Sequence, residues 1–368
     1  MIVNEDLSVN ADGDFEEITK DDISKALAKK LGTTNFVVLS YTLKPLSERI
    51  GLLGDHSVLY VNMLDEEGDE RKTSFFVKYF PKLEAPAKFA DGIGAFKKGD
   101  PNYTLLVLST KRKSRQNWES ITDYRTITEK NFEESFFNDR EDFVNIKGVE
   151  ASIKCVIKEI DIFDFSHKLL SGKSFPVVAK DACNRIYELV KPSKKYRNVL
   201  CHGDLWATNF LLKYRIKDEP MVGCKFIDFQ CGRYVPPSQD VLSVLYLTTS
   251  REFRKTYMYQ VVGMYYSYLE KHLTVAGYNV NNIIPFDQFL ESCEQQKLFA
   301  IVQTAIYFPL ILISNDAVET LLSDVELNEK ALFEDRSYLV LAHMNKDESY
   351  IKRLRESIQD LKEYCDYL

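Results

Sequence analysis

The sequence predicts a mixed α+β protein, with a small β-containing N-terminal part and a larger, mostly helical C-terminal part. Two observations support this prediction. Over residues 57–80, two apolar, β-rich runs flank a turn-like segment, which is typical of an antiparallel hairpin. From residue 132 onward, apolar residues recur mostly at helical spacing, which is typical of helices that pack one face into a core.

Length and charge narrow the classes of function. A chain of 368 residues with 45% hydrophobic residues exceeds the usual size of a single core, so two lobes or two domains are expected. The formal net charge of −7 argues against nucleic acid or an anionic membrane surface as the main partner. A small-molecule ligand is the expected partner instead.

The cysteines and the apolar segments indicate a cytoplasmic protein. Seven cysteines are scattered through the chain without C-x-x-C spacing, which favours neither a zinc site nor the disulfide framework of a secreted protein. Residues 1–20 are acidic and lack the pattern of a signal peptide. The longest apolar run, residues 298–313, is shorter than a typical membrane span and is expected to be a buried helix.

The N-terminal part is expected to begin with a helix and to continue with strands. Residues 21–32 have acidic residues at the start and a glycine at the end, which are the usual signals of a helix. The hairpin follows over Ser57–Phe80, with its turn at "DEEGDE". Between residues 85 and 130 the periodicity is lost, apart from a strand-like segment at 103–108. The basic run at 111–115 is interpreted as a solvated loop.

The C-terminal part is expected to be helical and interrupted by one hairpin. The strands of this hairpin are "FLLKY" (210–214) and "VGCKFIDF" (222–229), joined by a polar turn. The predicted domain organisation is an N-terminal lobe over residues 1–110, an irregular basic linker over 111–131 and a helical lobe over 132–368.

One segment carries the strongest chemical signal. "VLCHGDLWATNFLLKY" (199–214) places His202, Asp204 and Asn209 between two apolar runs. The catalytic loop of protein kinases, H-R-D-L-x-x-x-N, has the same spacing of histidine, aspartate and asparagine. In phosphoryl transfer, a positioned carboxylate accepts the proton of the attacking hydroxyl, and oxygen ligands hold magnesium. The spacing therefore predicts Asp204 as the catalytic base and Asn209 as a magnesium ligand.

Two further motifs supply the remaining parts of such a site. Asp228 follows an apolar strand in "KFIDFQCG" and takes the place of the aspartate in the D-F-G triplet, which predicts a second magnesium ligand. Gln230 stands where that triplet has glycine, which points to kinases of small molecules. Lys78 lies in the apolar run "SFFVKYF", as the phosphate-binding lysine of V-A-I-K does. Upstream, Gly54 and Ser57 lie where a hairpin that covers the phosphates is expected.

These motifs together resemble a known family. "VLCHGDLWATN", "FIDFQ" and Asp240 in "PPSQDVLSVLY" are similar to the ecdysteroid 22-kinase-like family, also called the CHK kinase-like family, a relative of choline kinases and aminoglycoside phosphotransferases. The resemblance implies a two-lobed protein-kinase-like fold, with ATP and Mg²⁺ as cofactors. It implies transfer of the γ-phosphate to a hydroxyl of an ecdysteroid or a similar lipophilic alcohol. It also implies that His202 and Asp240 are structural supports.

The N-terminal lobe departs from the family pattern. After the lysine strand, the family has a helix whose glutamate pairs with that lysine, but "KFADGIGAFKKG" places Asp91 or Gly92 at that position. Two glycines also make this segment a poor helix. No hinge-like segment of the family type follows it. Two explanations stay open: a reduced lobe in the real protein, or a gene model that skips exons.

Alternative interpretations accompany these predictions. Lys78 is also consistent with a solvent-facing strand lysine, and Gly54 and Ser57 with a simple tight hairpin. The acceptor is alternatively a cation of the choline or aminoglycoside type. A third interpretation is a catalytically impaired pseudokinase that binds a ligand without turnover. No motif identifies the acceptor or the oligomeric state.

Overall fold

The computed structural model describes residues 18–46, 55–79, 134, 136–139, 145–214 and 221–368. These residues form two compact units. The first contains the helix α1 and most of the strands β1, β2 and β3, and the second contains every element from α3 onward. The predicted mixed α+β class is confirmed, and the small N-terminal sheet with a helical C-terminal part is compatible with a kinase-like fold.

The first unit begins with α1 (Lys20–Leu31). Thr19 caps its start, because the Thr19 hydroxyl accepts the Asp22 backbone N–H at 3.2 Å and the Asp22 carboxylate accepts the Thr19 N–H at 3.1 Å. The helix ends at Gly32, whose φ of 77° closes the last turn. The helix predicted over residues 21–32 is therefore confirmed.

A three-stranded sheet follows, in the order β1 (Val37–Pro45), β2 (Asp55–Leu64) and β3 (Glu70–Tyr79). The hairpin predicted over Ser57–Phe80 is confirmed as β2 and β3, whereas β1, which pairs antiparallel with β2, was not predicted. Every second side chain of β2 is buried, in the order Ser57, Leu59, Val61 and Met63. This alternation places one face of the sheet in a core.

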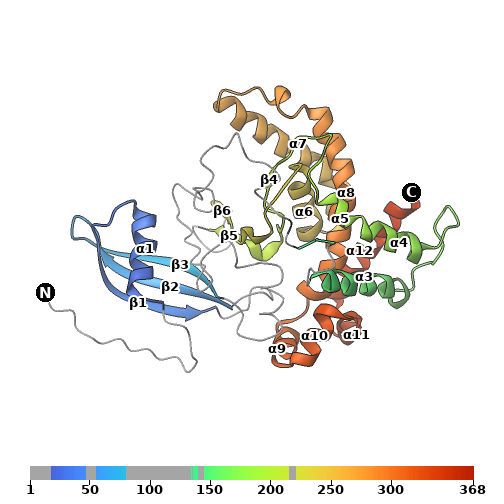
Figure 1. Cartoon of the computed structure of the whole chain (residues 1–368), viewed down its shortest axis with the longest axis horizontal. Helices are drawn as coiled ribbons and strands as arrows, with labels where there is room; N and C mark the ends of the chain where they lie inside the picture. The colour runs from blue at the N-terminus through green and yellow to red at the C-terminus, as the bar shows by residue number, and fades with distance from the viewer. Residues whose placement is uncertain (1–17, 47–54, 80–133, 135, 140–144, 215–220) are drawn as a thin grey trace. The chain divides into compact units, whose positions relative to one another are not determined.

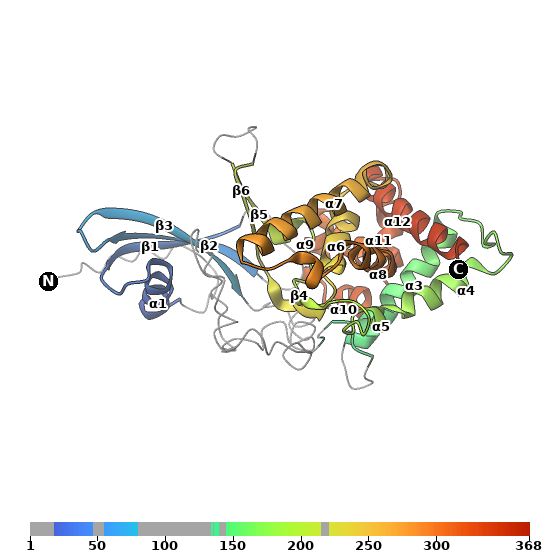
Figure 2. The same ribbon diagram turned by 90° about the horizontal axis from the view of Figure 1, so that it is seen from above.

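The helix α1 covers one face of this sheet, as both views show (Figure 1, Figure 2). Ile23, Ala26 and Leu27 of α1 are buried. The Nζ atom of Lys30 lies 4.8 Å from the centre of the Phe75 ring of β3. An amphipathic helix on an alternating sheet thus forms the small core of this unit.

The second unit is built mainly of helices. They are α3 (Asn145–Ile162), α4 (Phe175–Asn184), α5 (Ile186–Leu189), α6 (Ser238–Thr248), α7 (Arg251–Val275), α8 (Phe286–Ile311), α9 (Asn315–Ser323), α10 (Val325–Phe333), α11 (Ser337–His343) and α12 (Glu348–Asp366). The apolar run at residues 298–313 lies largely in α8, against which α3, α6 and α12 pack. The prediction of a buried helix there is confirmed.

Two small antiparallel sheets lie in the second unit. The predicted hairpin is confirmed as β5 (Phe210–Lys213) and β6 (Gly223–Phe226). The second pair, β4 (Val199–Cys201) and β7 (Arg233–Val235), was not predicted, because three-residue strands are too short to show a periodicity. These two pairs enclose the chain segment that carries the predicted catalytic motif.

Among the described residues, no single helix is long and apolar enough to cross a membrane. The helices α8 and α9 together meet the length and composition of a span, but they are bent by 76° at the break between them. All seven cysteines lie in the described part of the chain and are free thiols.

Several sequence predictions lie outside the described residues. They are the strand-like segment at 103–108, the linker at 111–131, the position of the missing glutamate at Asp91 or Gly92, and Gly54. The predicted domain boundaries at residues 110 and 131 lie outside the described residues as well.

Candidate active site

The predicted catalytic loop is a sharp turn between β4 and the 3₁₀ helix η3 (Ala207–Asn209). Gly203 has a φ of 79°, and a Cβ atom at this position would lie 2.2 Å from the carbonyl oxygen of Cys231. Only glycine tolerates both the left-handed backbone and the close approach. The glycine of the H-G-D motif is therefore explained by the packing of this loop on the segment that follows Asp228.

Asp240, in the first turn of α6, anchors the loop. Its two carboxylate oxygens accept the backbone N–H groups of His202 at 2.6 Å and Gly203 at 2.9 Å. Hydrogen bonds to a carboxylate are among the stronger ones in proteins. The anchor holds the backbone immediately before Asp204, in the way that the implied role of structural support requires.

His202 connects the loop to the strand that precedes Asp228. Its Nε2 atom lies 2.7 Å from the carbonyl oxygen of Ile227, and its Nδ1 atom lies 3.3 Å from the backbone nitrogen of Asp204. A carbonyl accepts only, so Nε2 carries the proton and Nδ1 accepts the Asp204 N–H. Burial lowers the pKa of His202, which keeps the ring neutral in this arrangement.

Asn209 lies beside Asp204 and is 4% exposed. Its Nδ2 atom donates to the Asp204 carbonyl oxygen at 2.7 Å and to the Asp204 carboxylate at 3.1 Å. Because the carbonyl accepts only, these bonds fix the amide with its nitrogen toward Asp204. The Oδ1 atom, which is the metal-binding atom of an asparagine, then faces away from Asp204.

Asp228 is brought to the same loop by the backbone. Its neighbour Ile227 donates an N–H to the carbonyl of Asn209 at 3.0 Å and accepts the His202 ring proton. Asp228 itself has a φ of 64° and a ψ of 62°, a left-handed conformation that is uncommon outside glycine. Such strain is frequent at functional sites. The structure thus brings His202, Asp204, Asn209, Asp228 and Asp240 together in one unit.

The surroundings of Asp204 are largely dry. Asp204 is 8% exposed. Burial, followed by the nearby charge of Asp204, raises the pKa of the Cys231 thiol and of the Tyr307 phenol well above their ordinary values. Both groups are therefore neutral at physiological pH.

Arg233, which sequence analysis did not single out, packs against the catalytic loop near Gly203. It is 1% exposed, and its Nε atom lies 2.9 Å from a carboxylate oxygen of Glu134. Its guanidinium carbon lies 5.5 Å from the centre of the Phe137 ring and 5.4 Å from that of Phe299. A buried arginine between two rings is held by its ion pair and by cation–π contacts. The feature of the sequence that could have pointed to Arg233 is its position within a short apolar strand.

Two of the predicted nucleotide-binding residues, Ser57 and Lys78, belong to β2 and β3, whereas Gly54 lies outside the described residues. Lys78 lies near the end of β3, but its side chain lies outside what the structure describes. Ser57 lies in β2 opposite Pro45 of β1 and is 2% exposed. The contacts of Lys78, Ser57 and Gly54 with a nucleotide stay predictions.

The donor set of the loop fits magnesium. Asn209 offers an amide oxygen and Asp228 a carboxylate, which are the hard oxygen ligands that Mg²⁺ prefers. These two residues would hold the ion, and the ion would neutralise charge on the phosphates of a bound nucleotide.

Comparison with known proteins identified a family with a similar sequence. A search of curated proteins found no match. Residues 107–278 match the sequence model of the ecdysteroid kinase-like family, and this segment contains Asp204, Asn209, Asp228 and Asp240. The family is kinase-like, which indicates transfer of a phosphoryl group to a small molecule. The segment that carries the candidate active site is thus similar to the ecdysteroid kinase-like family, the family that the motifs resemble.

Proposed function

We propose that this protein is an ATP- and magnesium-dependent kinase that phosphorylates a hydroxyl group of a small molecule. The observation that supports it most is the position of Asp204, a nearly buried carboxylate held by His202, Asn209 and Asp240. Phosphoryl transfer requires positioned groups more than covalent chemistry, and a rigid loop meets that requirement.

Each residue of the loop has a task in this proposal. Asp204 accepts the proton of the attacking hydroxyl, as a general base must from within hydrogen-bond reach. Asn209 and Asp228 bind the magnesium ion through oxygen atoms. Lys78 binds the nucleotide phosphates. His202 and Asp240 act through the loop by fixing its backbone.

The acceptor in this proposal is an ecdysteroid or a similar lipophilic alcohol. The support for it is the match to the ecdysteroid kinase-like family. A cationic acceptor of the choline or aminoglycoside type is the alternative acceptor, and a pseudokinase without turnover is the alternative activity. A panel of steroid, choline and aminoglycoside alcohols, assayed for phosphorylated product, distinguishes the acceptors.

The test of the mechanism is Asp204→Asn. We expect kcat to fall by about 100- to 10,000-fold, the usual contribution of a positioned general base. Magnesium–ATP should still raise the melting temperature, because a ligand that binds only the native state stabilises it. The exposed Asp181 of α4 supplies the matched control, and Asp181→Asn should turn over at the wild-type rate.

Two results separate the proposal from its alternatives. Unchanged kcat in Asp204→Asn contradicts the role of this carboxylate. A wild-type protein that magnesium–ATP does not stabilise, and that phosphorylates no acceptor of the panel, is a pseudokinase instead.

A further inference from the structure

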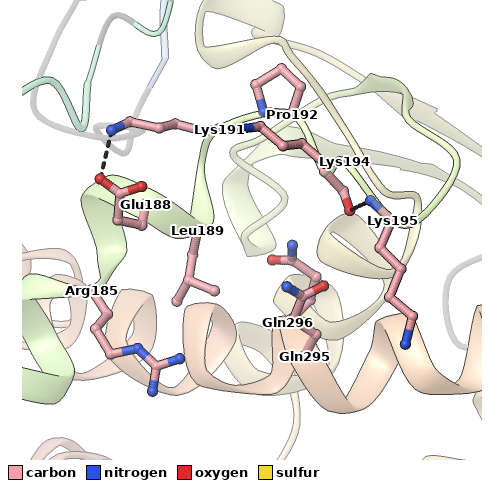
Figure 3. A pocket seen from close by; sticks show the side chains of 10 residues that line it. Arg185, Glu188, Leu189, Lys191, Pro192, Lys194, Lys195, Gln295 and Gln296 are labelled. Carbon is pink, nitrogen blue, oxygen red and sulfur yellow. Dashed lines mark hydrogen bonds and ion pairs between the residues drawn. The ribbon is translucent and has the colours of Figure 1, made fainter.

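A cavity of about 610 Å³ lies in the helical unit, away from the catalytic loop. Its walls are the end of α5, the segment at residues 191–195 that follows it, and α8. Figure 3 shows Arg185 and Leu189 on one side, Lys194 and Lys195 on the other, and Gln296 reaching from α8 between them. This volume lies within the range of small-molecule sites.

The cavity is strongly basic, although the whole chain carries a net charge of −7. Four cationic side chains line it (Arg185, Lys191, Lys194 and Lys195), against one carboxylate, Glu188. Lys191 pairs with Glu188 at 2.6 Å, and Lys195 pairs with Glu291 at 2.7 Å. Within the part of the chain that the structure describes, Arg185 and Lys194 form no ion pair. Both residues are exposed, so two solvated cations line the cavity without a protein counter-charge.

Gln296 adds a buried hydrogen-bond donor to this wall. Gln239 accepts from Arg233 at 3.3 Å, and its amide nitrogen donates to the Leu189 carbonyl at 3.0 Å. Arginine only donates and a carbonyl only accepts, so the orientation of Gln239 is fixed. Its nitrogen also lies 3.0 Å from a side-chain atom of Gln296, and that atom must be the oxygen.

The amide nitrogen of Gln296 therefore points away from Gln239. No hydrogen bond to it is found among the described residues, although Gln296 is only 3% exposed and lines the cavity. Solvent reaches this nitrogen, because it is not among the fully buried polar atoms that lack a hydrogen-bond partner. The wall therefore offers an N–H₂ group to a ligand that accepts hydrogen bonds.

We propose that this cavity binds a small, soluble phosphate monoester. A tetrahedral phosphate offers several oxygens that can accept from an amide such as that of Gln296 or pair with cations such as Arg185 and Lys194, and arginine matches phosphate geometry well. The volume exceeds that of inorganic phosphate and leaves room for an ester group. This site is separate from the catalytic loop and does not depend on the function proposed for that loop.

The test is calorimetric titration of the full chain with glycerol 3-phosphate, in a magnesium-free buffer of low ionic strength. We expect a dissociation constant of about 1 mM or below, as a few charge-assisted contacts give. The double variant Arg185→Gln, Lys194→Gln should weaken binding by about tenfold or more. Gln296→Glu keeps an acceptor for Gln239 but turns a carboxylate toward the ligand, and should abolish binding.

Matched controls make the result decisive. The double variant Lys255→Gln, Lys271→Gln also removes two positive charges, but from the exposed face of α7. It should change the affinity less than twofold, because distant exposed charges are screened. Asp228→Asn should leave binding unchanged. Malonate, a dicarboxylate, should bind at least about tenfold more weakly than the phosphate monoester.

The proposal is overturned by any of four results. They are no measurable heat with glycerol 3-phosphate, equal weakening by the control pair, loss of binding in Asp228→Asn, or malonate binding as tightly as the phosphate monoester. Unchanged binding in a folded Gln296→Glu protein, judged by its melting temperature, also contradicts the proposal.

Discussion

Two turns of this molecule share two features, a glycine with a positive φ and a carboxylate that accepts backbone N–H groups. They differ in how far along the chain the carboxylate lies from the turn. In the turn between β2 and β3, Gly68 has a φ of 85°, and one oxygen of Asp65 accepts the N–H groups of Glu67 and Asp69 at 3.0 and 2.9 Å. In the catalytic loop, Gly203 has a φ of 79°, and the Asp240 carboxylate accepts two backbone N–H groups. The first turn is complete within five consecutive residues, whereas Asp240 lies 37 residues beyond Gly203.

The difference teaches what makes a turn suited to catalysis. The β2–β3 turn is mostly exposed, and its backbone N–H groups are bonded by a residue of the same turn, so local rules account for its shape. The catalytic loop is buried against η4 (Phe229–Cys231), α6 and α8, and each of these segments contributes a contact. Long-range contacts hold a side chain in one place more firmly than a local turn does, and the general-base role proposed for Asp204 needs that accuracy.

The largest expected effect comes from the glycines. Gly203→Ala introduces a Cβ atom 2.2 Å from the Cys231 carbonyl, so we expect the free energy of unfolding to fall by about 3 kcal/mol or more. Gly68→Ala and Gly277→Ala should each cost only about 1 kcal/mol, the strain of a left-handed alanine, since a Cβ atom there meets nothing within 4 Å. Chemical denaturation of the three variants measures this. Equal losses would show that backbone strain alone, and not packing, requires Gly203.

The second effect concerns the two carboxylates. Asp240→Asn keeps the shape but turns an N–H₂ group toward one of the two backbone donors, so we expect a loss of about 2 kcal/mol. The displaced loop should also lower kcat. Asp65→Asn should destabilise the protein less, because the two backbone hydrogen bonds of Asp65 are exposed, so water can replace them. A stability series with kcat measured on the same samples tests this, and a larger loss for Asp65→Asn would reverse the comparison.

The smallest effect is a pH dependence from His202. Burial lowers its pKa in the folded state below the ordinary value of 6.5, so the unfolded chain takes up the proton first as the pH falls. The stability contributed by neutral His202 is therefore complete above about pH 6.5 and is lost below it, with a slope of at most about 1.4 kcal/mol per pH unit. His202→Asn should make the unfolding free energy depend less steeply on pH below pH 7.

The control for this effect is the exposed His272 of α7. His272→Asn should keep the wild-type slope, because this substitution leaves His202 and its two hydrogen bonds in place. The same slope in His202→Asn and in the wild type would contradict the neutral, doubly hydrogen-bonded state of His202.

Local patterns in the sequence predicted several elements correctly. The acidic start and the glycine end predicted α1, and alternating apolar residues around "DEEGDE" predicted β2 and β3. The spacing of His202, Asp204 and Asn209 led to residues that the structure brings together. Helix periodicity, turn chemistry and fixed motif spacing are all properties of consecutive residues, so they can be read without the fold.

Other features were decided only by the tertiary structure. The strands β4 and β7 pair residues more than thirty positions apart, and neither strand is long enough to show a pattern. Arg233, Gln239 and Gln296 form a buried polar network across three elements, yet each looks like an ordinary surface residue in the sequence. Burial and hydrogen-bond partners depend on which distant segments meet, and that is a property of the packed fold. The sequence by itself thus determined the residues suited to the chemistry, and the packed fold decided how they are held.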